Sequence, residues 1–131
     1  MPLALALTAL AGCGGGGKQY ANDPRPAAPI VITAAITQGS VNVSPNQFGA
    51  GLVQLVVVNL TNRSQQLSLV SKGGANFHQQ TGPINPQETA RLQAQLGSGA
   101  YSLSSGDASV HPAKLTVGPQ RPNSNTQLLQ P

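Results

Sequence analysis

The sequence predicts an all-β domain, a sandwich or a barrel, and two observations lead to this prediction. The first is a hydrophobic period of two from Ile30 onward, which is clearest over 88–96, where apolar and polar residues alternate. The second is turn chemistry, because Gly, Pro and Asn recur between short apolar runs. Short strands separated by such turns are typical of a β-sandwich or barrel.

Two segments define the expected strands best. The run 52–59 is apolar at nearly every position and rich in Val, which predicts a strand that is buried on both sides or lies in a sandwich core. The segment 88–96 alternates instead, which predicts a strand with one buried face. Further strands are expected at 30–37, 40–43, 65–71, 100–104 and 114–117, with turns between them that include Gly49-Ala50-Gly51.

The two ends of the chain differ in composition from the strand-forming part at 30–118. Residues 13–29 are rich in Gly and Pro, which predicts a flexible tether ahead of a domain at 30–118. Residues 119–131 are mostly Pro, Gln, Asn and Ser, which supply almost no core, so a disordered polar tail is expected there. A domain of this length has room for one hydrophobic core.

The only cysteine follows a run of small residues near the N-terminus. Leu10, Ala11 and Gly12 precede Cys13, and an apolar stretch that is far shorter than the ~20 residues of a membrane-spanning helix comes before them. This tetrad resembles the lipobox of bacterial lipoproteins, whose cysteine receives a diacylglyceryl group with palmitate-type chains before the chain is cut ahead of it. The resemblance implies a signal peptide at 1–12, lipidation of Cys13 and anchoring on the extracytoplasmic side of the cell membrane, where two acyl chains hold a protein stably. A signal normally begins with positive charge, which is missing here, so we expect its true start upstream of Met1.

Composition restricts the partners. The net charge of +4 comes from seven basic residues scattered along the chain, whereas proteins that bind nucleic acid cluster theirs on one face. Charged residues make up 8% of the chain, aromatic residues make up 3%, and Trp is absent, so stacking platforms are scarce. The expected partners are therefore the membrane, through Cys13, and an extracytoplasmic protein or polymer, with no nucleic acid.

The order of the segments carries a second resemblance. An early strand is followed by the step 43–45, a Phe before two glycines, and an apolar strand that ends at Asn59. The polar segment 84–90 then leads into the alternating strand, and a Gly-Ser-Gly turn precedes Tyr101. This order, over 30–118, is similar to that of the cupredoxins and implies a Greek-key sandwich.

The copper ligands of that family are missing from the matching positions. A blue-copper site takes two His and a Cys thiolate, often with an axial Met. The last loop offers only His111, and the one methionine is Met1, so the resemblance implies a scaffold without a type 1 copper site or another cofactor. The neutral residues at the other expected ligand positions are Gln65, Gln66, Ser104 and Ser105.

No constellation for catalysis is evident, so we expect a protein that is not an enzyme. The acids are Asp23, Glu88 and Asp107, which offer no carboxylate pair of the glycosidase type. A serine triad with either histidine and Asp107 is a weak coincidence because serines are abundant. The alternative is a metal or redox accessory protein that uses His78 and His111, although no acid or Cys has ligand spacing to either.

The leading expectation is a lipid-anchored, exported sandwich that serves as a binding or structural module at the outer face of a bacterial membrane. In sandwiches, binding residues lie most often on end loops. The segments 72–83 and 105–111 are the candidate binding loops of this chain.

Overall fold

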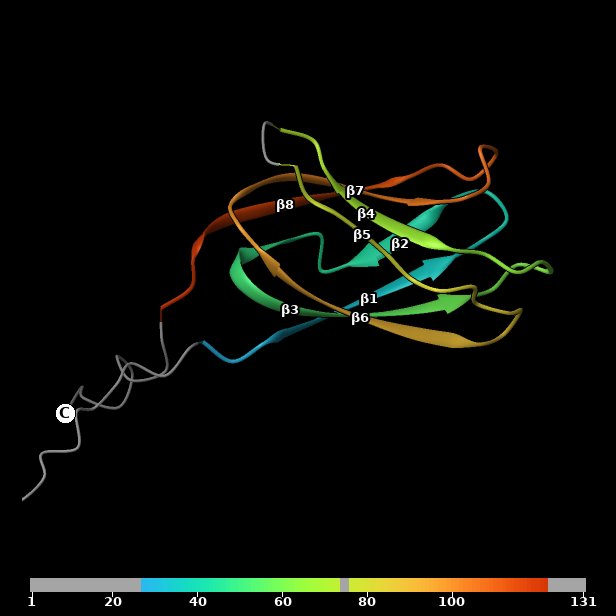
Figure 1. The fold of residues 1–131 in the computed structure, drawn as a ribbon, viewed down its shortest axis with the longest axis horizontal. Helices are drawn as coiled ribbons and strands as arrows, with labels where there is room; N and C mark the ends of the chain where they lie inside the picture. The colour runs from blue at the N-terminus through green and yellow to red at the C-terminus, as the bar shows by residue number, and fades with distance from the viewer. Residues whose placement is uncertain (1–26, 74–75, 123–131) are drawn as a thin grey trace, which may run out of the picture.

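The longest strand, β3 (Gln47–Asn59), belongs to both sheets of the sandwich (Figure 1). In this computed structural model, which describes residues 27–73 and 76–122, the first residues of β3 pair with β8 and the rest pair with β1 and β6. The change from one sheet to the other occurs beside a register shift between Gly49 and Ala50, and Gly51 has a φ of 139°. The three residues 49–51, which the sequence predicts as a turn between strands, are thus a bend within one strand.

The two sheets share this strand and confirm the prediction of an all-β sandwich. One sheet has the strand order β2-β1-β3-β6, and the other has β3-β8-β7-β4-β5. The pairings of β3 with β1 and with β8 are parallel, and the others are antiparallel. The remaining strands are β1 (Ile30–Ile36), β2 (Val41–Ser44), β4 (Leu67–Ser71), β5 (His78–Gln80), β6 (Thr89–Leu96), β7 (Gly99–Ser105) and β8 (Ala113–Gln120).

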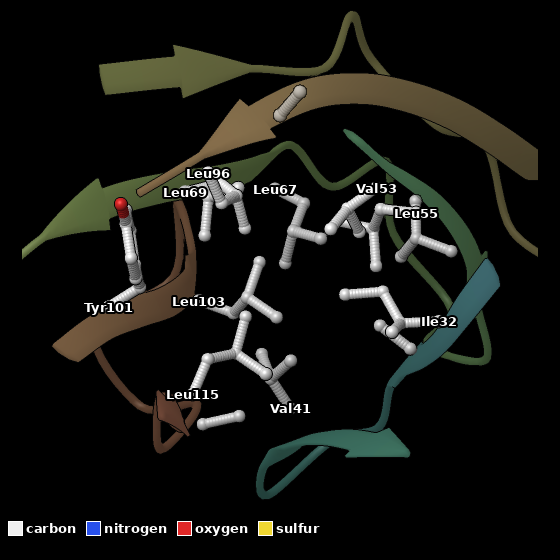
Figure 2. Close-up of a cluster of buried hydrophobic side chains, with 14 of the residues drawn as sticks. Ile32, Val41, Val53, Leu55, Leu67, Leu69, Leu96, Tyr101, Leu103 and Leu115 are labelled. Atoms are coloured by element: carbon white, nitrogen blue, oxygen red, sulfur yellow. The ribbon is translucent and has the colours of Figure 1, made fainter. Parts of the chain in front are cut away.

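The core lies between the two sheets, and Figure 2 shows its side chains pointing toward one another from both. The strand β6 alternates between exposed and inward residues, with Leu96 1% exposed, as its sequence predicts. The strand β3 takes the second of its two predicted forms, a strand in a sandwich core, because its alternate residues Leu52, Val56 and Val58 are only half-buried. A strand in a two-layer sandwich has one core face, and the Val residues on the other face suit the strand conformation without being fully buried.

The strand boundaries differ from expectation in two further places. The short strand β5 is absent from the sequence prediction, because His-Gln-Gln has no apolar period. The strand β8 continues to Gln120, and the backbone N–H of Arg121 donates to Ala50 O at 3.2 Å, so the expectation of disorder from 119 is corrected at its start. The pairing of 116–120 with 47–50 of β3 supplies the order that this polar sequence lacks by itself.

Several expectations concern residues outside the described ones. The signal segment 1–12, Cys13, most of the linker and the tail from 123 all fall there. Within 27–73 and 76–122, no helix is long and apolar enough to cross a membrane.

The loops gather at the two ends of the sandwich. Four of them, 37–40, 60–66, 81–88 and 106–112, lie at one end, which we call the four-loop end. The first and last described residues lie at the opposite end, as Figure 1 shows on the left of the view. The four loops and the first and last described residues therefore lie at opposite ends of the sandwich.

Candidate functional site

A buried asparagine organises the four-loop end. Asn59, the last residue of β3, is 0% exposed, and its Nδ2 donates to the carbonyls of Arg63 at 2.7 Å and Ile84 at 2.8 Å. Its Oδ1 accepts from the backbone N–H of Thr61 at 2.9 Å and from the Thr61 hydroxyl at 2.7 Å. These bonds fix the loop 60–66 against the loop 81–88, because a buried amide in a fully satisfied network holds each partner in one place.

Backbone bonds add a third loop to this framework. Gln65 N–H donates to Ile84 O at 3.0 Å, and Ile84 N–H donates to Gln65 O at 2.8 Å. Gly106 N–H donates to Gln66 O at 3.2 Å, which attaches the loop 106–112. These bonds join the backbones of the three loops to one another. The side chains that border the cavities therefore start from backbone positions that are held by hydrogen bonds.

Two adjoining cavities open on this framework. The larger, of about 560 Å³, is bordered by residues of the loops 60–66, 81–88 and 106–112. The smaller, of about 250 Å³, is bordered by the loops 37–40, 60–66 and 106–112. The residues common to both cavities are Arg63, Gln65 and Asp107.

Asp107 supplies negative charge at the cavities. Hydrogen bonds from the hydroxyl of Ser109 at 2.7 Å and from its backbone N–H at 2.9 Å lower the pKa of Asp107 below its ordinary 3.8, and the charge of Arg63 adds to the effect. Both bonds end on Oδ1, and the Asp107 N–H donates to Ser105 Oγ at 3.1 Å. The carboxylate is therefore held in place and ionised near neutral pH.

Arg63 supplies positive charge at the same cavities. Its carbonyl accepts from Asn59 Nδ2 and from the Thr61 hydroxyl, the latter at 2.9 Å, so its backbone is fixed. Its guanidinium is exposed and makes no hydrogen bond or ion pair with any described residue, Asp107 included. The two charges thus influence each other without neutralising each other by direct contact.

Gln65 borders both cavities together with these two charged residues. The residue is only 7% exposed, yet its side-chain amide has no hydrogen-bond partner in the described part of the chain. The one side-chain atom there that is sealed from solvent without a partner is Gln79 Oε1, so the Gln65 amide opens to the cavities. The sequence expectation treats Gln65 only as a poor copper ligand and overlooks this role. The strand alternation with Leu67 and Leu69 is the signal that places it on the inward face.

The structure does not bring the two histidines together. His78 on β5 and His111 before β8 are both exposed. The row of paired residues His78, Val70, Ser102 and Lys114 crosses β5, β4, β7 and β8, which are three strand spacings, or about 14 Å. A single ion cannot be shared over that span by side chains on these strands. Within 27–73 and 76–122, no group of three or more His, Cys, Asp or Glu could hold a metal ion.

The other sequence candidates take different positions. The predicted binding segment 105–111 borders both cavities. The other predicted binding segment, 72–83, runs from one end of the sandwich to the other. Its first part lies at the end opposite the four loops, and Pro83 borders the larger cavity. Gln66 borders the larger cavity, and its Oε1 accepts from Gln80 Nε2 at 2.9 Å. Glu88 borders neither cavity, and its Oε2 accepts from Asn85 Nδ2 at 3.1 Å. Ser104 and Ser105 close β7, and Asp23 and Cys13 lie outside the described residues.

Comparison with known proteins bears on the fold. No family model matches the sequence, and no curated protein is found to be similar to it. Among solved structures, a Cu(I) form of an amicyanin mutant is 11% identical, covers 73% of this chain and 94% of its own, and has a TM-score of 0.47. A copper-containing nitrite reductase from Thermus scotoductus SA-01 is 14% identical over 79% of this chain and 30% of its own, with a TM-score of 0.43. The chain is similar to these copper proteins at low identity, and the comparison assigns no copper site to this chain.

Proposed function

We propose that this chain is a lipid-anchored binding module, displayed on the outer face of a bacterial membrane, which binds at its four-loop end. The observation that supports this most is the position of the cavities. They lie at the end of the sandwich opposite Ala27, the first described residue, and Cys13 precedes that residue in the chain. A lipid on Cys13 would therefore attach the domain by its far end and leave the cavities facing away from the membrane.

The chemistry of the cavities favours binding over catalysis. Asp107 has a lowered pKa, so it stays ionised and lacks the proton that a general acid must supply near neutral pH. Glu88 lies outside both cavities, where it accepts a hydrogen bond from Asn85. The groups that remain, a guanidinium, a carboxylate and an amide, are suited to holding a ligand by charge and hydrogen bonds.

Display and orientation can be tested by thiol labelling of the full chain in its own host. The variant Asn62→Cys places a thiol on the exposed loop 60–66, and Ala94→Cys places one in the core as a matched control, since Ala94 is 5% exposed. We expect a membrane-impermeant maleimide to label Asn62→Cys on unlysed spheroplasts and to leave Ala94→Cys unlabelled. The wild type should also stay unlabelled, because a lipid would block Cys13, its only thiol.

The same labelling experiment can also contradict the proposal. Labelling of Asn62→Cys only after lysis would place the domain in the cytoplasm and overturn the proposal. Labelling of the wild type would show a free thiol at Cys13 and remove the anchor. The variant Cys13→Ser should move from the membrane fraction to the soluble fraction while keeping the circular dichroism of the folded sandwich.

A further inference from the structure

We infer that the two cavities of the four-loop end form one binding site for a small zwitterion, a ligand that carries both an ammonium and a carboxylate group, as free amino acids and short peptides do. This inference rests on the proposed function, because it names the ligand class of the same site. It depends on Gln65, Arg63 and Asp107, the three residues that border both cavities.

The amide of Gln65 is the group that most needs a ligand. Buried polar side chains are almost always hydrogen-bonded, yet this residue is more than nine-tenths buried and its amide has no partner among the described residues. The backbone of Gln65 is held on both sides by Ile84, so the side chain cannot leave the cavity wall easily. A primary amide offers both donors and an acceptor, which match a peptide group or a carboxylate beside an ammonium.

The two charges select the ends of the ligand. The guanidinium of Arg63 has no described partner, and its planar fork matches a carboxylate through two parallel hydrogen bonds. The Oδ1 atom of Asp107 accepts both bonds from Ser109, and no described donor occupies its Oδ2 atom. That second oxygen is free to accept from an ammonium group.

A zwitterion fits these groups better than the other small ligands of similar size. A simple anion would meet the carboxylate of Asp107, and a simple cation would meet the guanidinium of Arg63, because both charges border the same cavities. A neutral sugar would leave both charges unpaired, and the described linings of the two cavities contain no aromatic ring on which it could stack. A ligand with both charges pairs with both residues and leaves its middle against Gln65.

The test uses the isotope-labelled full chain in detergent micelles, followed by NMR. The probes are alanine and the dipeptide Ala-Ala, with the doubly blocked N-acetyl-alanyl-alanine amide and sucrose as matched neutral controls. We expect saturable shifts of the backbone signals of 61–66 and 106–109 with at least one zwitterion, and the comparison of alanine with Ala-Ala shows whether the site takes one residue or two. The blocked peptide and sucrose should bind at least tenfold more weakly.

Variants and pH separate recognition from folding. Arg63→Gln and Asp107→Asn should each weaken binding at least tenfold, whereas Arg91→Gln, an exposed change on β6, should leave it unchanged. Asp107→Asn keeps an oxygen for Ser109, so its circular dichroism should match that of the wild type. Binding of Ala-Ala should be lost above pH ~8 as its α-amino group loses its proton, and below pH ~3.5 as carboxylates gain theirs.

The outcomes distinguish this inference from the proposed function. Equal binding of the zwitterions and the neutral controls, or the absence of shifts at 61–66 and 106–109 with every probe, would overturn the ligand class while surface labelling of Asn62→Cys still supported display. Labelling only after lysis, together with selective zwitterion binding, would overturn display and keep the site.

Discussion

Arg121 closes the sandwich over Gly51. The Nη2 atom of Arg121 donates to Leu52 O at 2.6 Å, Nε donates to Ala50 O at 3.2 Å, and Nη1 donates to Ala28 O at 2.7 Å. A Cβ added at Gly51 would lie 2.7 Å from Nη2, closer than real Cβ atoms approach other heavy atoms. One guanidinium, on the residue that follows β8, thus joins the bend of β3 to Ala28, two residues ahead of β1.

The close approach predicts that Gly51→Ala is destabilising. The backbone at Gly51 has a φ of 139°, which an L side chain rarely adopts, and the new methyl group would displace Arg121. We expect a loss of about 1–3 kcal/mol in the free energy of unfolding, measured by urea denaturation. Gly39→Ala is the matched control, because nothing lies within 4 Å of an added Cβ there. Equal stability of the two variants would show that Arg121 does not constrain the bend.

Asn59 predicts a second stability effect. Asn59→Ala leaves the buried N–H of Thr61 without its acceptor. The carbonyls of Ile84 and Arg63 each lose one donor and keep another, the Gln65 N–H and the Thr61 hydroxyl respectively. We expect a loss of about 1–3 kcal/mol in the free energy of unfolding, measured by urea denaturation, since one unsatisfied buried donor costs about that much. Asn62→Ala, an exposed change three residues away, should shift the midpoint little. Faster hydrogen exchange at 61–65 in Asn59→Ala would connect the loss to the four-loop end.

The pairing of β3 with β6 offers a test of burial. Leu55 is 2% exposed and pairs with Leu92, whereas the neighbouring pair Gln54 and Gln93 faces outward. Leu55→Asp should prevent folding, because an unpaired charge in the core costs several kcal/mol. Gln93→Asp should be tolerated. Circular dichroism of both full-length variants checks this, and a folded Leu55→Asp variant would contradict the assignment of the core.

The lowered pKa of Asp107 predicts a contribution to stability that depends on pH. Since the pKa of Asp107 is lower in the folded chain than its ordinary 3.8, the ionised group stabilises the fold above that value. The contribution should disappear as the pH falls through the lowered pKa. Urea midpoints of the wild type and Asp107→Asn should therefore differ near pH 6 and converge as the pH falls below the lowered pKa of Asp107. A difference that persists unchanged at low pH would show that the effect does not come from ionisation.

Alternation made much of the fold predictable from the sequence. The strand β6 and the inward face of β4 follow from apolar residues at every second position, because a sheet with one core face imposes that period. The bend of β3 was not predictable in this way, because Gly49 and Gly51 are equally typical of a turn. The bend lies against Arg121, which is distant in the sequence and donates to Ala50 O and Leu52 O.

The site depends on long-range contacts even more. Strand alternation could place Gln65 on the inward face, but only the meeting of three loops shows that its amide opens to a cavity. The separation of His78 from His111 depends on the order of β5, β4, β7 and β8 in one sheet, which no local pattern contains. Residue type alone therefore allowed a metal site shared by these two histidines, whereas the strand order places them too far apart for one.

The most direct test of the proposed display is the intact mass of the mature protein recovered from the membrane fraction of its own host. We predict a chain that begins at Cys13 and carries the added mass of a diacylglyceryl group, which would anchor the domain at the end opposite Arg63, Gln65 and Asp107. An unmodified chain that retains residues 1–12 would contradict the anchor and leave a free thiol at Cys13.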